Sequence, residues 1–191
     1  MLFRSQTQTG TILAIADKLE TLVGIWGVGL APTGDKDPYA LRRHALGICR
    51  LLLEKNLSLS LPALIELARS QFPQPEVQEK AQVADVYAFI IDRLRAYLRD
   101  QAVAGKPFTS AEIDAVLSQS PAQINDLIER LAALREFNAL AQASQLAAAN
   151  KRISNILKKT TTAIPATCSS KLLQIPAEAT LNQALEAVTP T

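Results

Sequence analysis

Hydrophobic residues recur at intervals of three and four along most of this chain, which is the spacing of helices with one buried face. The first such segment, residues 11–23, has these apolar side chains on one face: Ile12, Ile15, Ala16, Leu19, Leu22 and Val23. The same spacing predicts helices over residues 38–55, 60–71, 76–101, 109–118, 120–159 with a break near 139–145, and 175–188. Alternating runs typical of strands are nearly absent, so the pattern predicts an all-α bundle or array of about eight helices.

Capping residues mark two of the predicted helix starts. Asp37 is a good N-cap, and Pro38 suits the first helical position because its missing N–H has no partner to lose there. Thr109 and Glu112 match the capping box, in which each side chain accepts the other residue's free backbone N–H. We therefore predict helices that begin at these two points.

A glycine-rich loop separates the first two predicted helices. Gly24, Gly27 and Gly29 weaken the end of the first helix, since each glycine costs about 1 kcal/mol relative to alanine. The loop sequence GVGLAPTGDKD lacks the GxxxxGK[ST] pattern of a phosphate-binding loop, and no predicted strand precedes it. We favour a tight connection between helices, with Gly29 or Gly34 at positive φ.

The composition is that of a globular protein, with 48% hydrophobic and 20% charged residues among 191. This length suits one domain or two small ones. The net charge of +2 is too small for a global field that attracts nucleic acid, so any basic surface must be local. Cys49 and Cys168 fit no metal or disulfide spacing and are interpreted as a buried residue and a loop thiol. With no signal-peptide pattern and no apolar run of membrane-spanning length, we expect a cytoplasmic protein.

Acid–base and metal chemistry have few candidate residues. Asp17 lies on the first predicted helix, but the chain has one histidine, His44, and no His-Asp pair. A carboxylate binds a metal only with partners at suitable spacing, so we interpret Asp17 as a helix-face residue that pairs with a nearby cation. No nucleophilic triad can be assembled around His44. The sequence predicts no catalytic residue and no metal ligand.

The best basic candidate is the segment at residues 147–159. Lys151 and Lys158 are seven residues apart, as are Arg152 and Lys159, and no acidic residue occurs from 138 to 171. A helix with these cations on one side is suited to phosphate contacts, which give affinity without base specificity. Lys158 and Lys159 can equally complement the dipole of a helix C-terminus. The sequence does not decide between these two interpretations.

Two other arginine groups have structural explanations. The arginines of the second predicted helix can bind phosphates or pair with neighbouring carboxylates, and we favour pairing. The arginines are Arg42, Arg43 and Arg50, and the carboxylates are Asp35, Asp37 and Glu54. The arginines of the long predicted helix are interleaved with acids, which is typical of a solvated face with salt bridges: Arg93, Arg95 and Arg99, with Asp92 and Asp100.

Three segments resemble, in order, the beta subunit of bacterial-type, two-subunit glycyl-tRNA synthetase. The longest is ADKLETLVGIWGVGLAPTGDKDPYALRR at residues 16–43, and the others are FIIDRLRAYL at 89–98 and AAANKRISNIL at 147–157. Six residues match the family's motif, and the resemblance implies a structural role for them: Asp17, Gly34, Asp37, Pro38, Arg42 and Arg43. Asp17 matches only the last acidic position of an HD-type motif, so no phosphohydrolase chemistry carries over.

The resemblance implies the C-terminal part of a longer subunit. Residues 1–73 are then the end of an HD-like helical domain and a helical body, and residues 74–191 a DALR-like anticodon-binding region that is incomplete at its C-terminus. In this family the alpha subunit activates glycine with ATP, and the beta subunit recognises tRNA-Gly within an alpha/beta hetero-tetramer. The expected chain therefore binds no cofactor and no membrane and is non-catalytic alone.

The resemblance also implies tRNA contacts, most directly at Lys151 and Arg152, with Lys158 and Lys159 beside them and Arg93 and Arg95 as weaker candidates. Two alternatives stay open. One is a helical interaction module from a truncated gene, with no role on RNA. The other is a remnant of an HD-type phosphohydrolase, against which the missing His-Asp pair argues.

Overall fold

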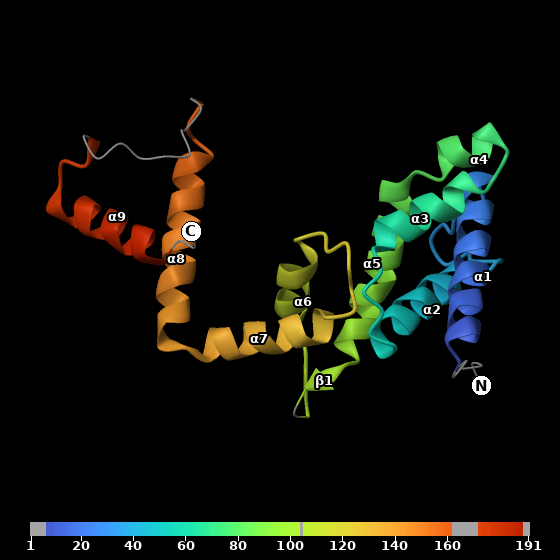
Figure 1. The fold of residues 1–191 in the computed structure, drawn as a ribbon, viewed down its shortest axis with the longest axis horizontal. Helices are drawn as coiled ribbons and strands as arrows, with labels where there is room; N and C mark the ends of the chain where they lie inside the picture. The colour runs from blue at the N-terminus through green and yellow to red at the C-terminus, as the bar shows by residue number, and fades with distance from the viewer. Residues whose placement is uncertain (1–6, 104, 162–171, 189–191) are drawn as a thin grey trace. The chain divides into compact units, whose positions relative to one another are not determined.

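The computed structural model describes residues 7–103, 105–161 and 172–188, and within these ranges it holds nine helices and one short hairpin (Figure 1). The chain divides into two compact units, residues 1–141 and 142–191. The prediction of an all-α fold is confirmed. The assignment of HD-like and DALR-like domains on either side of residue 73 stays a prediction, and helices from both sides of that point pack together in the first unit.

The first unit begins with a group of helices around a shared core (Figure 1). Its elements are α1 (Gln8–Gly27), α2 (Leu41–Glu54), α3 (Leu61–Ser70), α4 (Pro75–Lys80) and α5 (Val83–Arg99). Helix α1 packs against α2, α3 and α4, while α5 packs against α2 and α3. The largest fully buried side chains here come from every helix except α4: Leu22, Leu41, Ile48, Leu52, Leu61, Ile65, Ile90, Leu94 and Leu98.

A second set of elements extends the same core. An antiparallel hairpin of β1 (Ala102–Val103) and β2 (Lys106–Pro107) pairs Ala102 with Pro107, and α6 (Ser110–Leu117) and α7 (Leu127–Ala139) follow it. Helix α6 packs on α5 and on α7. Thr109 and Glu112 form the predicted capping box at the start of α6, with the Glu112 N–H donating to Thr109 Oγ1 at 3.2 Å. That prediction is confirmed, whereas the hairpin had no signal in the pattern.

Helix α1 does not weaken at its glycines as predicted but continues to Gly27. The reason is close packing: a Cβ atom on Gly24 would lie 3.0 Å from the Phe72 ring, and one on Gly27 only 2.4 Å from Val77 Cγ1. The absence of a side chain lets α4 approach α1, and the burial of Val77 offsets the helix propensity lost at glycine. Gly29 and Gly34 both adopt positive φ, at 83° and 50°, as the loop interpretation requires.

Helix α2 begins at Leu41, three residues later than predicted. Asp37 still satisfies its first turn, because the carboxylate accepts from the backbone N–H groups of Leu41 at 2.8 Å and Arg42 at 3.0 Å. Pro38 lies in a turn before the helix, and Ala40 has a left-handed φ of 56° that blocks extension toward Pro38. The prediction of Asp37 as N-cap was therefore wrong in position although its capping chemistry is present.

Two other predicted helix boundaries were wrong. The segment at 76–101 forms two helices, α4 and α5, which are separated at Ala81. The helix predicted from Ser120 begins only at Leu127. Before it, the Pro121 carbonyl accepts from the Tyr87 hydroxyl at 3.0 Å and the Ala122 carbonyl accepts from the Leu61 N–H at 2.7 Å, so tertiary contacts use groups that a helix would need.

The second unit contains α8 (Ala141–Leu157) and α9 (Pro176–Val188). The predicted break near 139–145 is confirmed by the end of α7 at Ala139, and the predicted helix over 175–188 is confirmed by α9. Among the described residues of this unit, Ala143 is the only buried one. The prediction of a buried Cys49 is confirmed, and Cys168 lies outside the described residues.

Candidate nucleic-acid interface

The basic segment comprises the C-terminal part of α8 and the turn after it, which holds Lys158 and Lys159. The helix contains no glycine or proline and is rich in alanine, which has the highest helix propensity. Its last turn is completed by backbone bonds from Lys158 N to the Ser154 carbonyl at 3.0 Å and from Lys159 N to the Ile156 carbonyl at 3.0 Å. All four predicted cations of this segment are exposed: Lys151, Arg152, Lys158 and Lys159.

Three of these cations gather around one surface hollow. Lys151, Arg152 and Lys159 line it together with Asn155, and Ala148 and Ile156 supply its apolar surface. Within the described residues, no carboxylate forms a salt bridge with any of the three. From Lys151 to the end of α8 at Leu157 the helix rises about 9 Å, and Lys159 lies beyond that end, so the cations follow an elongated path rather than a single point.

This arrangement bears on the two interpretations of the basic segment. A helix dipole attracts cations within its last turn, which accounts for Lys158 and Lys159. Lys151 and Arg152 lie more than a turn before the end of α8 at Leu157, so the dipole does not explain them. Exposed guanidinium and ammonium groups without carboxylate partners are suited to phosphate oxygens, and the Asn155 amide can donate beside them.

The weaker candidates on α5 have partners already. Arg93 pairs with Asp92 and lies 6.0 Å from the Phe89 ring centroid, while Arg95 Nε donates to Asp114 Oδ1 at 2.9 Å and so ties α5 to α6. A phosphate would have to compete with these carboxylates. The contribution of Arg93 and Arg95 to tRNA binding stays a prediction.

The opening motif, residues 16–43, joins α1 to α2. Within it the Arg42 guanidinium donates to the Gly34 carbonyl, and Asp37 caps α2 as described above. Asp17 lies 3.9 Å from Lys18 Nζ, and Arg43 is exposed on α2. These contacts give the motif a structural role, since they fix the connection between α1 and α2.

Neighbouring residues of α2 show the same structural character. Beyond the motif, Arg50 pairs with Glu54 at 2.9 Å on α2. The pKa of His44 is lowered, first by burial and then by the charge of Lys18 on α1, which favours a neutral imidazole.

Burial also decides the chemistry of Cys49. The thiol donates to the Ile90 carbonyl at 3.7 Å, and burial raises its pKa to about 12, so it is a poor nucleophile. In the described part of the chain, no group of three or more His, Cys, Asp or Glu side chains is placed to hold a metal ion. No helix there combines the length and apolar content that crossing a bilayer requires.

Sequence reasoning missed one prominent ionic cluster. Arg135 of α7 binds Glu112 through two bonds of 2.9 and 3.0 Å, donates to the Lys106 and Pro107 carbonyls, and lies 4.7 Å from the Phe108 ring centroid. The cluster joins the hairpin, α6 and α7. The capping box gave a signal for Glu112, but nothing in the sequence pairs it with a residue 23 positions away.

Comparisons with known proteins agree with the segments of resemblance. The family model described as glycyl-tRNA synthetase beta subunit matches residues 4–118. A glycine–tRNA ligase beta subunit from Ralstonia nicotianae is 51% identical over 184 residues, and one from Leptothrix cholodnii is 51% identical over 185. These alignments cover 96% and 97% of this chain, so they extend through α8.

The relatives are much longer than this chain, which spans 25% of the length of each. The family model alone accounts for more than half of the 191 residues, and the identity holds across both units. The chain belongs to the glycyl-tRNA synthetase beta subunit family.

Proposed function

We propose that this chain is a tRNA-recognising part of a glycine–tRNA ligase beta subunit and supports the synthesis of glycyl-tRNA. The observation that carries the proposal is the cluster of Lys151 and Arg152 on α8 with Lys159 just after it, exposed and without salt bridges in the described residues. Family membership supplies the context, since the relatives are named as subunits of an enzyme that joins glycine to tRNA. The nucleic acid proposed for the cluster is therefore tRNA-Gly.

The proposed contacts are to the sugar–phosphate backbone. Arg152 is suited to a bidentate contact with one phosphate, and Lys151 and Lys159 act as point charges on its neighbours. Such contacts fix the position of the RNA without reading its sequence, so selection of tRNA-Gly requires base contacts elsewhere. The expected binding is strongly dependent on salt concentration, because each neutralised phosphate releases counterions.

In this proposal the chain does no chemistry itself. Glycine activation with ATP belongs to the alpha subunit, with which the beta subunit forms an alpha/beta hetero-tetramer in the cytoplasm. The chain's role is to hold tRNA-Gly so that its acceptor end reaches the alpha subunit. Adding alpha subunit to this chain alone is expected to give no glycyl-tRNA, because the chain spans only 25% of its relatives.

Filter binding of tRNA-Gly at several salt concentrations tests the proposal. The double variant Lys151→Ala with Arg152→Ala is expected to lower affinity about tenfold at low salt. The slope of log K against log salt should become shallower by about 1.5, as two phosphate contacts are lost. Alanine suits a helix, so circular dichroism should show an unchanged fold.

A matched control separates a local site from overall charge. Lys80→Ala with Lys106→Ala removes the same charge from two exposed positions outside α8 and is expected to bind like the unchanged chain. Equal losses in both double variants would indicate non-specific attraction. A folded chain that fails to bind tRNA-Gly at low salt would contradict the proposal and favour the interaction module.

A further inference from the structure

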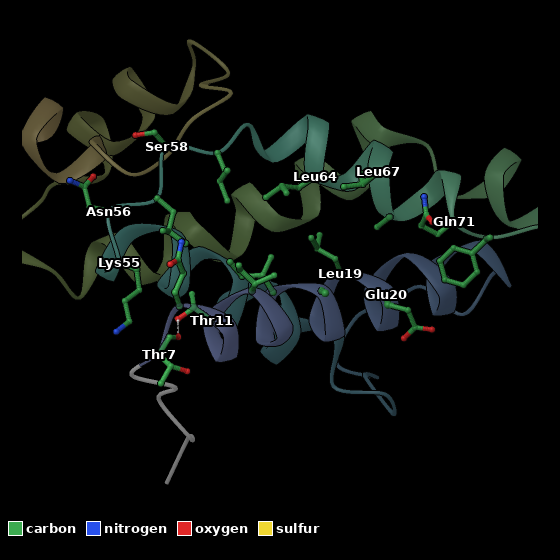
Figure 2. A pocket seen from close by; sticks show the side chains of 18 residues that line it. Thr7, Thr11, Leu19, Glu20, Lys55, Asn56, Ser58, Leu64, Leu67 and Gln71 are labelled. Carbon is green, nitrogen blue, oxygen red and sulfur yellow. Dashed lines mark hydrogen bonds between the residues drawn. The ribbon is translucent and has the colours of Figure 1, made fainter.

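The first unit has an apolar groove between α1 and α3 with a volume of about 1120 Å³. Leu19 of α1 and Leu64 and Leu67 of α3 lie along its middle (Figure 2). Polar side chains lie toward its two ends, Asn56 and Ser58 at one and Gln71 at the other (Figure 2). Only Glu20 and Lys55 carry charge among the described residues that line it.

The groove exposes apolar side chains that a helix normally buries. Ile12 of α1 is 62% exposed and Leu67 of α3 is 60% exposed, although both belong to the apolar spacing of their helices. Leu59, between α2 and α3, is 41% exposed at one end. Solvation of these apolar side chains is unfavourable, and an apolar groove with polar ends is suited to contact with another polypeptide or ligand.

The shape of the groove indicates a helical occupant. Its α1 wall uses Thr11, Ile15 and Leu19, four residues apart, and its α3 wall uses Leu64, Leu67 and Gln71 at intervals of three and four. Two such rows of side chains form a groove into which the side-chain ridge of a third helix packs. The ten residues of α3 are about 15 Å long, which matches about three turns of such a helix.

The lengths of the relatives indicate where this helix comes from. The chain spans 25% of the Ralstonia nicotianae beta subunit, so three quarters of such a subunit is polypeptide that this chain does not contain. A groove with one acid and one base on its walls resembles a permanent interface, which is more apolar than a transient one. We propose that the α1–α3 groove is the packing site for an apolar helix from the remaining polypeptide of a beta subunit.

This inference rests on family membership and not on tRNA binding, so it can fail while the proposed function stands. Thiol labelling without RNA tests it. Leu67→Cys and Ile12→Cys place one thiol on each wall, and Leu13→Cys places a control on α1 at a residue that is 69% exposed and does not line the groove. The residues aligned with these three in the intact Ralstonia nicotianae beta subunit are likewise changed to cysteine. Maleimide modification of each cysteine-containing peptide is followed by mass spectrometry.

We expect thiols at 67 and 12 to react at least tenfold more slowly in the intact subunit than in this chain, while the thiol at 13 changes less than about threefold. Native Cys49 reports folding in this chain, because it is buried and should stay unmodified in each variant. For the intact subunit, circular dichroism checks that each variant is folded.

Three results would overturn the inference. Equal rates at 67 in the chain and in the folded intact subunit would mean that the groove stays open. Equal slowing at 13 and 67 would mean that surface outside the groove is covered to the same extent, with no specific site in the groove. Protection at 67 that grows with the concentration of this chain alone would assign the groove to a second copy.

Discussion

Gly27 lies where Val77 of α4 packs closely against α1. A methyl group there would lie 2.4 Å from Val77 Cγ1 and 2.8 Å from Val77 Cα, and the backbone atom cannot move without shifting α4. On an open helix, Gly→Ala stabilises by about 1 kcal/mol. Here we expect Gly27→Ala to lower the free energy of unfolding by about 1–3 kcal/mol, as overpacking does. Urea denaturation measures the change.

Gly24→Ala is the matched control for that prediction. Its added methyl group would meet the tip of the Phe72 ring at 3.0 Å, which a small rotation relieves. We expect its stability to stay within about 1 kcal/mol of the unchanged chain, because propensity and packing nearly cancel. If Gly27→Ala proves as stable as Gly24→Ala, the close approach of α1 and α4 is not rigid.

These two glycines also show what residue-level reasoning can reach. Propensity correctly identifies them as costly in a helix, but the gain that offsets the cost comes from Phe72 and Val77, about fifty residues later. Asp37 was foreseen as a cap because its chemistry is local. The residue at which α2 begins was not, since it depends on the left-handed Ala40. Arg135 was missed for the same reason as Val77: its partner is distant in sequence.

The element with the clearest electrostatic anchor is α6. Arg135 and the Thr109 backbone N–H both bind the Glu112 carboxylate, and together they lower its pKa from 4.5 to about 2. A carboxyl group whose pKa is lower in the folded state stabilises the fold above pH 4.5. That contribution is lost as the pH falls from 4.5 toward 2.

Glu112→Gln removes this charge while retaining the size of the side chain. We expect its free energy of unfolding near pH 7 to be lower than that of the unchanged chain by about 1 kcal/mol, since the ion pair with Arg135 lies near the surface. The difference should shrink between pH 4.5 and pH 2 and vanish below that range. Thermal unfolding at several pH values measures it. A difference that does not change with pH would contradict the assignment.

At the scale of elements, the sequence predicted which segments are helical better than where helices end. The capping box places α6 because both partners lie within four residues. The break between α4 and α5 contains no glycine or proline, and Ala81, at the break, is completely buried. The periodicity continues across it because Val77 faces Gly27 of α1 while Val86 enters the shared core. The break is therefore explained by tertiary packing against α1 and the core, which the local sequence does not contain.

For the whole molecule, the two units differ sharply in burial. The first has a continuous apolar core, whereas the second buries only Ala143 among its described residues and exposes Ile153, Ile156 and Leu181. Local stability follows buried apolar area, so the second unit should unfold at lower urea concentration. The basic cluster was predictable from charge alone, but this difference in stability was not, since α8 and α9 have the same apolar spacing as buried helices.

Two probes separate the units. The single tryptophan, Trp26, lies 5.2 Å from the Phe89 ring centroid within the first unit, so its fluorescence reports that unit alone, whereas far-ultraviolet circular dichroism reports all helices. We expect part of the dichroism signal to be lost at urea concentrations that leave the fluorescence unchanged. Coincident curves would mean that the units unfold together and would contradict this prediction.

Adding tRNA-Gly connects this behaviour to the proposed function. A ligand that binds only the folded second unit raises its stability by RT ln(1 + [L]/Kd), about 2.7 kcal/mol at a hundredfold excess over Kd. The early dichroism transition should therefore move to higher urea while the Trp26 transition stays in place. In the Lys151→Ala with Arg152→Ala variant the same tRNA concentration should give a much smaller shift. If tRNA instead moved only the fluorescence transition, the RNA would be bound by the first unit, and α8 would not be the interface.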